Sequence, residues 1–231
     1  SLHDALPILQ VTGSIKFDLT IDPELLARAA ALREQWGASE RPVWIAASTH
    51  EGEDAVVLAA HRQLLASYPN ALLILVPRHQ ERFGPMFELC GQQGFTTVRR
   101  SSGEPVTAHT NVLLGDTMGE LLFLYALADS AFVGGSLVAT GGHNPLEPAA
   151  LGKPVIMGPH RFNFLEISAM LRDAGALREV DDAEGLAEAV RQLFELPQDA
   201  QRMAQAGLKV MQANQGALTR LLDGLDRLIT H

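Results

Sequence analysis

The most unusual residue pattern in this sequence is a glycine-rich segment that ends in an Asn-Pro-Leu-Glu run. It reads Gly134-Gly135-Ser136 and then, five residues later, Gly141-Gly142-His143-Asn144-Pro145-Leu146-Glu147. Glycines in a loop lose much conformational entropy on folding, so four of them favour a loop whose backbone lies close to a ligand. Glu147, on the first turn of a following helix, is placed to accept hydrogen bonds from two ribose hydroxyls. The positive end of that helix would offset the charge of a phosphate.

A second interpretation of the same run needs no ligand. Asn144 is a good N-cap, Pro145 suits the first helical position, and Glu147 then falls at the third. His143 either donates a hydrogen bond to a phosphate or is an ordinary loop histidine. The sequence favours binding for this cluster, with helix capping as the alternative.

Two other segments carry groups that suit an anionic ligand. Ser48 and Thr49 follow an apolar run, and their hydroxyls and amides could meet an anion at a helix N-terminus. Simple capping by either residue is the alternative, and on this segment alone it is favoured. Arg78 follows Pro77 at the end of the next apolar run, where a guanidinium could fork onto a phosphate or a base carbonyl. A surface salt bridge is the alternative for Arg78.

A fourth segment joins Gly115 to Glu120. Thr117 and Glu120 have the spacing of a capping box, which would explain both residues without a ligand. That interpretation leaves Gly119 unexplained, because glycine is a poor helix former in a first turn. A glycine at this position also suits close approach of a ligand to the backbone, so the two interpretations have equal weight.

The elements that must position these segments alternate between strand and helix. Four of the apolar runs end just before the segments described above, and in parallel sheets ligands bind outside the carboxyl ends of the strands. The alternation predicts an α/β fold with a doubly wound parallel sheet, Rossmann-like, covered on both faces. The predicted strands are 43–47, 71–76, 96–98, 112–114, 130–133, 154–157 and 176–180, and the predicted helices are 23–36, 53–67, 81–93, 119–127, 145–151 and 162–173, with helix nearly throughout after 181.

Composition limits the classes of function. The chain has 231 residues, 47% of them hydrophobic, with a net charge of −9, which argues against a nucleic-acid-binding surface. The single cysteine, Cys90, cannot form an internal disulfide, which favours a reducing, cytoplasmic compartment. No apolar run approaches the roughly 20 residues of a membrane span. The eight histidines lack metal-ligand spacing, so the sequence predicts a site without metal or cofactor that relies on arginine and helix dipoles.

The first ten residues fit no element. Residues 1–8 read like the conceptual translation of a sequencing adapter, and there is no initiator methionine. We therefore expect residues 1–10 to be a non-native or linker segment, with an ordinary loop as the alternative. Residues 11–231 are then expected to form one domain.

Together these segments resemble the Kdo transferase (3-deoxy-D-manno-octulosonic acid transferase) family. The resemblance covers residues 11–231 and is most specific in the run through Glu147. It implies the C-terminal, donor-binding, Rossmann-like domain of a GT-B glycosyltransferase, which takes Kdo from CMP-Kdo and transfers it to a lipid A precursor with inversion and without metal. It also implies work at the cytoplasmic face of the bacterial inner membrane. The segments that carry it are 11–18, 47–53, 77–83, 115–121, 132–148, 158–164 and 214–217.

The resemblance also assigns residues. It implies three donor-binding groups, and our interpretation of the strand ends selects the same three places: Pro77 and Arg78; Met118, Gly119 and Glu120; and Asn144, Pro145, Leu146 and Glu147. Ser48, Thr49 and His143 are further candidates for donor contacts.

The catalytic residue is not expected among these positions. In the family the base is a glutamate of the N-terminal domain, and no residue here matches its motif. We therefore assign none, and expect the chain alone to be inactive in transfer. The alternatives are a GT-B transferase for a nucleoside-diphosphate sugar, of the lipid A disaccharide synthase type, and a plain nucleotide-binding or regulatory module. Competition between CMP and UDP separates them.

Overall fold

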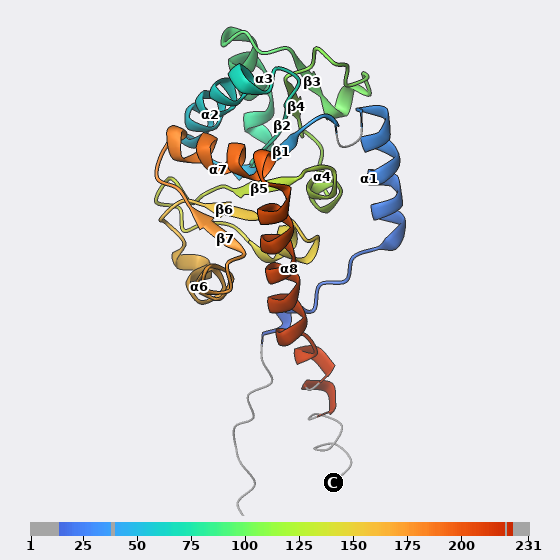
Figure 1. Cartoon of the computed structure of the whole chain (residues 1–231), viewed down its shortest axis with the longest axis vertical. Coiled ribbons are helices and arrows are strands. Elements are labelled where there is room, and N and C mark those ends of the chain that lie inside the picture. Colours follow the sequence, from blue (N-terminus) through green and yellow to red (C-terminus); the bar gives the residue numbers. More distant parts are fainter. Residues whose placement is uncertain (1–13, 38–39, 220, 224–231) are drawn as a thin grey trace, which may run out of the picture.

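The computed structural model describes residues 14–37, 40–219 and 221–223, and this part of the chain is built on a parallel sheet of seven strands (Figure 1). The strand order is β3-β4-β2-β1-β5-β6-β7. The predicted doubly wound parallel fold is therefore confirmed. The strands are β1 (Val43–Thr49), β2 (Leu72–Pro77), β3 (Thr97–Arg99), β4 (Val112–Leu114), β5 (Ser130–Val133), β6 (Val155–Met157) and β7 (Leu177–Glu179).

The order of the strands reverses beside β1. This central strand pairs with β2 on one side and with β5 on the other, both in parallel. After β1 the chain adds β2, then the edge strand β3, and then β4 between β2 and β3. It then crosses to the opposite side of β1 and adds β5, β6 and β7 in order. Open α/β sheets bind ligands in the crevice at such a reversal, outside the carboxyl ends of the strands.

Helices cover both faces of the sheet (Figure 1). One hydrophobic cluster joins the sheet to α2, α3 and α7, a second joins it to α1 and α4, and a third packs α5, α6 and α8 against the β5–β7 side. The helices are α1 (Pro23–Gln35), α2 (Glu53–Ser67), α3 (Phe83–Gln92), α4 (Leu121–Leu127), α5 (Leu146–Ala150), α6 (Leu165–Asp173), α7 (Ala183–Glu195) and α8 (Pro197–Asn214).

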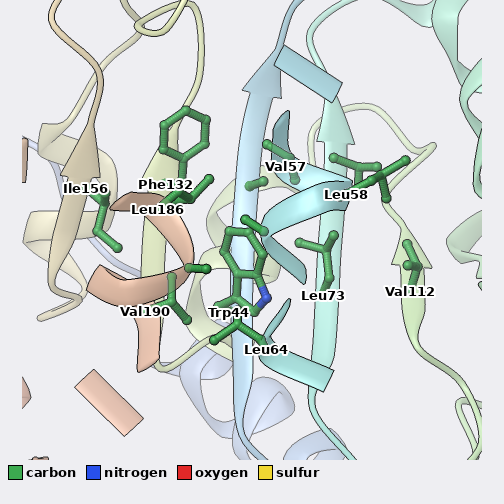
Figure 2. Packing of buried hydrophobic residues seen from close by; sticks show 14 of the residues in the cluster. Trp44, Val57, Leu58, Leu64, Leu73, Val112, Phe132, Ile156, Leu186 and Val190 are labelled. Carbon is green, nitrogen blue, oxygen red and sulfur yellow. The ribbon is translucent and has the colours of Figure 1, made fainter. Parts of the chain in front are cut away.

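Residues of β1 alternate between the two faces and are buried on both. Trp44 packs in the cluster under α2 and α7, among Leu73, Phe132 and Val190, as Figure 2 shows. Val43 and its neighbours at every second position lie in the cluster under α1 and α4. A strand covered on both faces reads as a continuous apolar run, which is why the sequence shows this one so clearly.

Several element ends differ from the predicted ones. The helix predicted at 119–127 begins only at Leu121, because Gly119 has a φ of +76° and lies outside it. The helix predicted at 81–93 divides into a 3-10 turn, Gln80–Arg82, and α3. The helical region after 181 is broken at Pro197, which cannot donate a helical hydrogen bond. The predicted N-cap Asp22 is confirmed, since its carboxylate accepts from Glu24 N at 2.8 Å. Residues 1–10 lie outside the described residues.

A buried histidine joins the core to the edge of the sheet. Trp44 Nε1 donates to His61 Nδ1 at 3.1 Å, so the ring proton of His61 lies on Nε2, which donates to the carbonyl oxygen of Asn111 at 2.9 Å. The side chain is fully buried, and burial lowers the pKa of His61 from 6.5 to about 4. His61 is therefore neutral in the folded protein at pH 7.

His61 makes the stability depend on pH. The unfolded chain binds a proton here below about pH 6.5, whereas the folded chain resists it down to about pH 4. Stability contributed by neutral His61 is complete above about pH 6.5 and is lost as the pH falls toward 4, up to about 3 kcal/mol. Urea unfolding at about pH 7.5 and about pH 4.5 should show a smaller loss in His61→Gln than in the parent. The exposed His109→Gln should lose as much as the parent, and equal losses in all three proteins would contradict this role of His61.

Candidate functional site

The carboxyl ends of β1, β2, β4 and β5 meet at one edge of the sheet, and backbone hydrogen bonds join their loops. Arg78 N donates to Thr49 O at 3.0 Å, which ties the end of β2 to the end of β1. Gly134 N donates to Ala47 O at 2.8 Å, which does the same for β5. On the far side of β2, the loop after β4 begins beside Val76, since β2 and β4 pair in parallel up to residue 114. The structure therefore brings all four predicted segments to the same edge.

A glutamate that sequence reasoning missed organises the glycine-rich loop. Glu53, at the start of α2, is fully buried, and its two carboxylate oxygens accept four backbone hydrogen bonds. Oε2 accepts from His50 N at 2.9 Å and Gly135 N at 2.7 Å, while Oε1 accepts from Ser136 N at 3.0 Å and Leu137 N at 2.9 Å. The amides at the start of this loop are thus occupied by the protein's own carboxylate. No sequence signal distinguished Glu53 from an ordinary first-turn acid.

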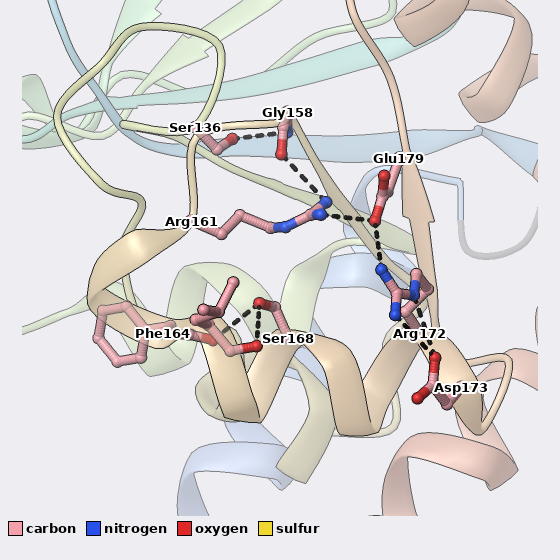
Figure 3. Close-up of polar contacts among 9 residues, drawn as sticks. Ser136, Gly158, Arg161, Phe164, Ser168, Arg172, Asp173 and Glu179 are labelled. Carbon is pink, nitrogen blue, oxygen red and sulfur yellow. Dashed lines mark hydrogen bonds and ion pairs between the residues drawn. The ribbon is translucent and has the colours of Figure 1, made fainter.

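Two glycines of the edge are required by backbone packing. A Cβ at Gly134 would lie 2.6 Å from Ser48 O, and one at Gly158 would lie 2.2 Å from Ser136 O. Ser136 Oγ also accepts from Gly158 N at 2.8 Å, so the loops after β5 and β6 touch backbone to backbone (Figure 3). The glycine at 134 is therefore explained by close contact with the backbone of β1. Of the other glycines in the run, 135, 141 and 142 all have positive φ.

Ser48 and Thr49 lie inside β1 rather than in the loop after it. The pairing of β1 with β2 is irregular between Ala47 and Thr49, and Ser48 at that bulge has a φ of +58°. Non-glycine residues in this conformation are strained and cluster at functional sites. Thr49 Oγ1 donates to Asp54 Oδ1 at 2.9 Å, and Gly52 takes the N-cap position of α2. The capping interpretation of Ser48 and Thr49 is therefore wrong.

Two arginines follow β2 and have different surroundings. Arg82 pairs with Asp54 of α2 and donates from Nη1 to Thr49 O at 2.8 Å. It therefore connects the segment after β2 with the end of β1 and the start of α2. Arg78 is exposed and forms no ion pair with any residue that the structure describes, so the salt-bridge interpretation is not supported. The positive charge of Arg78 nevertheless contributes to lowering the pKa of His143 and opposes the rise in the pKa of Glu147.

The Asn-Pro-Leu-Glu run begins α5 one residue later than the sequence predicts. Pro145, and not Asn144, takes the N-cap position, and α5 begins at Leu146. Asn144 Oδ1 accepts from Leu146 N at 3.1 Å in a local turn that precedes the helix. Burial raises the pKa of Glu147, and a hydrogen bond from Asn144 and the charge of Arg78 act in the opposite direction. Glu147 is thus a half-buried acceptor within electrostatic reach of a cation.

The loop after β4 holds its acidic side chain internally. Glu120 accepts from Arg100 Nη2 at 2.9 Å and from Thr117 Oγ1 at 2.6 Å. Burial alone would raise the pKa of Glu120, but these hydrogen bonds and the charge of Arg100 lower it. The predicted capping box does not form, because Glu120 takes the N-cap position without a side-chain bond to the helix. The turn presents Met118, 61% exposed, and Gly119 outward.

Three histidines come together beside Arg78. His50 Nε2 and His143 Nε2 lie 2.7 Å apart, and the ring of His79 meets that of His50 edge-on at 5.4 Å. Burial, followed by the nearby charges of His50 and Arg78, lowers the pKa of His143 to about 4. The sequence showed His143 as a candidate but gave no signal for its partner 93 residues away.

Metal-binding clusters and membrane-spanning helices are both absent from the described residues. No group of three or more His, Cys, Asp or Glu that could hold a metal ion is found among the described residues. None of the helices in the described ranges is both long and apolar enough to cross a membrane. A hollow of about 900 Å³ between α2 and α7 has no lining residue from these loops. Its lining includes Arg191 and Glu188, which pair with each other.

Comparison with known proteins identifies the family. Residues 40–210 match the family model of glycosyl transferases group 1. The 3-deoxy-D-manno-octulosonic acid transferase of Haemophilus influenzae is 50% identical over 216 residues, covering 93% of this chain and 50% of that protein. The Bordetella pertussis transferase of the same name is 43% identical over 225 residues, covering 94% of this chain and 51% of that protein. The chain therefore spans about half the length of these relatives.

Solved structures agree with the sequence comparison. The C-terminal CMP-Kdo binding domain of WaaA from Acinetobacter baumannii has a TM-score of 0.79 and 38% identity, covering 83% of this chain and all of that one. Anabaena HepE in complex with UDP and glucose has a TM-score of 0.61 at 16% identity, which shows the fold alone. The chain belongs to the group 1 glycosyl transferases and, within them, to the 3-deoxy-D-manno-octulosonic acid transferase family, where it matches the C-terminal domain.

Proposed function

We propose that this chain binds the CMP moiety of CMP-Kdo and forms the donor half of an enzyme that transfers Kdo to a lipid A precursor. The observation that carries the proposal is the meeting of Arg78, the Met118–Glu120 turn and the Asn144–Glu147 run at one edge of the sheet. That edge lies beside the reversal of strand order, where α/β sheets bind nucleotides.

The roles of the three groups follow from their chemistry. Arg78 is exposed and unpaired among the described residues, and its guanidinium suits a phosphate. Glu147 is half-buried, which strengthens its hydrogen bonds to ribose hydroxyls because water is partly excluded. The outward-facing Met118 and Gly119 offer an apolar side chain and an open backbone to the base. Pro77, Pro145 and Leu146 shape the loops that hold these contacts, and Ser48, Thr49 and His143 are further candidates.

The rest of the reaction is proposed from the relatives' names and the family resemblance. We propose direct displacement with inversion, no metal, and an acceptor and membrane surface engaged by the full-length enzyme at the cytoplasmic face of the bacterial inner membrane. This chain would stabilise the negative charge that grows on the CMP phosphate as the bond to Kdo breaks. We assign no catalytic base to it. The alternative of a nucleoside-diphosphate sugar donor is tested by UDP.

Calorimetry with CMP in the presence of EDTA tests the proposal. The chain should bind CMP without divalent metal, and UDP should neither bind comparably nor displace CMP. Binding that appears only with magnesium or manganese would contradict the metal-free site, and preference for UDP would favour the alternative donor.

The Glu147→Gln variant tests the role of one side chain within that experiment. Glutamine keeps the shape but removes the charge that strengthens bonds to ribose hydroxyls, which contribute roughly 1.5–3 kcal/mol. CMP affinity should fall about tenfold or more with little change in melting temperature. Asn144→Ala, which removes the hydrogen bond to Leu146 N, should instead cost about 1 kcal/mol of stability. Unchanged affinity in Glu147→Gln would remove this residue from the site.

A further inference from the structure

The two histidines at the carboxyl edge form a pair whose geometry requires a shared proton. The rings of His50 and His143 are nearly parallel, at 8°, with centroids 5.0 Å apart and their Nε2 atoms 2.7 Å apart. Two nitrogens at this distance form a hydrogen bond only if one of them carries a proton and the other does not. The ring of His143 packs against the backbone at Gly135, where an added Cβ would lie 3.0 Å from His143 Cδ2.

The pair has room for one further proton. In its neutral form one ring is protonated at Nε2 and the other at Nδ1, so one Nδ1 remains without a proton. A proton from solvent on that last Nδ1 gives a monocation that keeps the Nε2–H···Nε2 bond and makes it charge-assisted. A second added proton would place two N–H groups against each other and break the bond. Neither Nδ1 has a hydrogen-bond partner among the described residues, so both remain able to meet a ligand or solvent.

Burial and the charges around the pair decide its state in the free protein. Arg78, His79 and Arg82 come from the loop after β2, and Glu53 comes from the start of α2. Burial is the largest influence and lowers the pKa of His50, Glu53 acts in the opposite direction, and His79, Arg82 and Arg78 lower it further. Because burial also lowers the pKa of His143, the pair is neutral at pH 7.

We infer that the His50–His143 pair takes up one proton when the phosphate of the donor binds beside Arg78, and that the resulting monocation positions that phosphate. The inference rests on the proposed function, since it needs an anionic nucleotide at this edge. The monoester phosphate of CMP carries nearly two negative charges at pH 7. In the intact donor the phosphate is a diester with one negative charge, and the carboxylate of Kdo supplies the second. In both cases Arg78 supplies only one positive charge beside them. An adjacent anion favours the charged form of an imidazole, so the second positive charge comes from the pair. Both histidines are positioning residues.

Calorimetry in buffers of different ionisation enthalpy counts the protons. CMP is titrated into the protein at about pH 7 in PIPES, HEPES and Tris, and the dependence of the heat on the buffer gives the protons taken up. The second pKa of a phosphate monoester is about 6, so CMP contributes a small proton change of its own. That contribution is common to all variants and cancels in their difference. The parent should take up more protons per CMP than His143→Asn or His50→Asn, up to about half a proton at pH 7, because a neighbouring charge raises a pKa of about 4 by roughly 1–3 units.

Affinity should follow the same linkage. In the parent, CMP binding should weaken as the pH rises from about 6.5 to about 8.5, whereas in both histidine variants it should change much less. His109→Gln, on the exposed loop before β4, is the matched control and should behave like the parent. A structural role alone would lower affinity equally at every pH, so a uniform loss in the variants would overturn the inference.

The outcomes separate this inference from the proposed function. CMP that binds with the same proton uptake in the parent and in both variants overturns the inference and leaves the proposed function intact. Absence of CMP binding removes both. NMR of the histidine rings in the free parent gives a measurement without nucleotide: the pKa of both rings should lie below the ordinary value of 6.5, because both are partly buried. Independent titration of either ring near its ordinary value of about 6.5 would also overturn the inference.

Discussion

Gly158→Ala is expected to destabilise the chain by about 3 kcal/mol, because overpacking against backbone atoms cannot be relieved by a side-chain rotation. The new Cβ would lie 2.2 Å from the carbonyl oxygen of Ser136 and 2.4 Å from its carbonyl carbon. The hydrogen bond from Gly158 N to Ser136 Oγ, visible in Figure 3, would be strained at the same time. For a chain of this length we expect a fall in melting temperature of about 6–12 °C.

Gly91→Ala is the matched control for this prediction. Gly91 lies within α3, and a Cβ there would meet nothing within 4 Å. Alanine in a helix is more favourable than glycine by about 0.5–1 kcal/mol, so this variant should melt at the same temperature or slightly higher. Thermal unfolding followed by circular dichroism compares the two. A Gly158→Ala variant as stable as Gly91→Ala would show that the loops after β5 and β6 separate easily.

Glu53→Gln is expected to lower both stability and CMP affinity. The amide of glutamine has one acceptor oxygen, so its NH2 group would face two of the four backbone N–H groups that the carboxylate now binds. Leaving buried donors unsatisfied costs about 1–3 kcal/mol each, which predicts a loss of about 3 kcal/mol or more. CMP affinity should fall at least about tenfold, because the same bonds hold His50 and the loop that leads to His143.

Glu51→Gln is the control. Glu51 lies in the same turn but is exposed, and its replacement by glutamine removes the same formal charge. Surface substitutions of this kind usually change stability by less than about 0.5 kcal/mol. Urea unfolding and calorimetry with CMP should therefore separate the two variants. Equal behaviour of Glu53→Gln and Glu51→Gln would show that the buried carboxylate does not organise the loop.

The architecture of the sheet was predictable because its signals are local. Strand β1 is buried on both faces and reads as a continuous apolar run. Each crossover of the described chain except the one from β3 to β4 carries an α-helix. Parallel strands with such crossovers bring their carboxyl ends to one edge, so the positions of Arg78, the Gly115–Glu120 segment and the Asn-Pro-Leu-Glu run followed from the sequence. The errors were at element ends, as at Gly119, where a positive φ decides between helix and turn.

Capping was only partly predictable, because capping residues have other partners in the folded chain. Asn144 was expected at the N-cap of α5, but Pro145 takes that position, and Asn144 binds Leu146 N from one residue before it. Thr117 and Glu120 have the spacing of a capping box, but Arg100 lies close enough to bind the glutamate instead. The spacing of two residues along the chain shows which hydrogen bond is feasible within a turn. It does not show whether a residue distant in sequence, such as Arg100, binds the same side chain.

The sequence alone determined the fold, the edge where the loops gather and the residue types they offer, because these depend on hydrophobic period and on neighbours along the chain. Only the tertiary structure decided that Glu53 binds amides 82 to 84 residues away and that His50 meets His143 across 93 residues. It also decided that Gly158 touches Ser136. These contacts depend on the order in which the strands lie side by side, and a separation of this size along the chain leaves no periodic trace in the sequence.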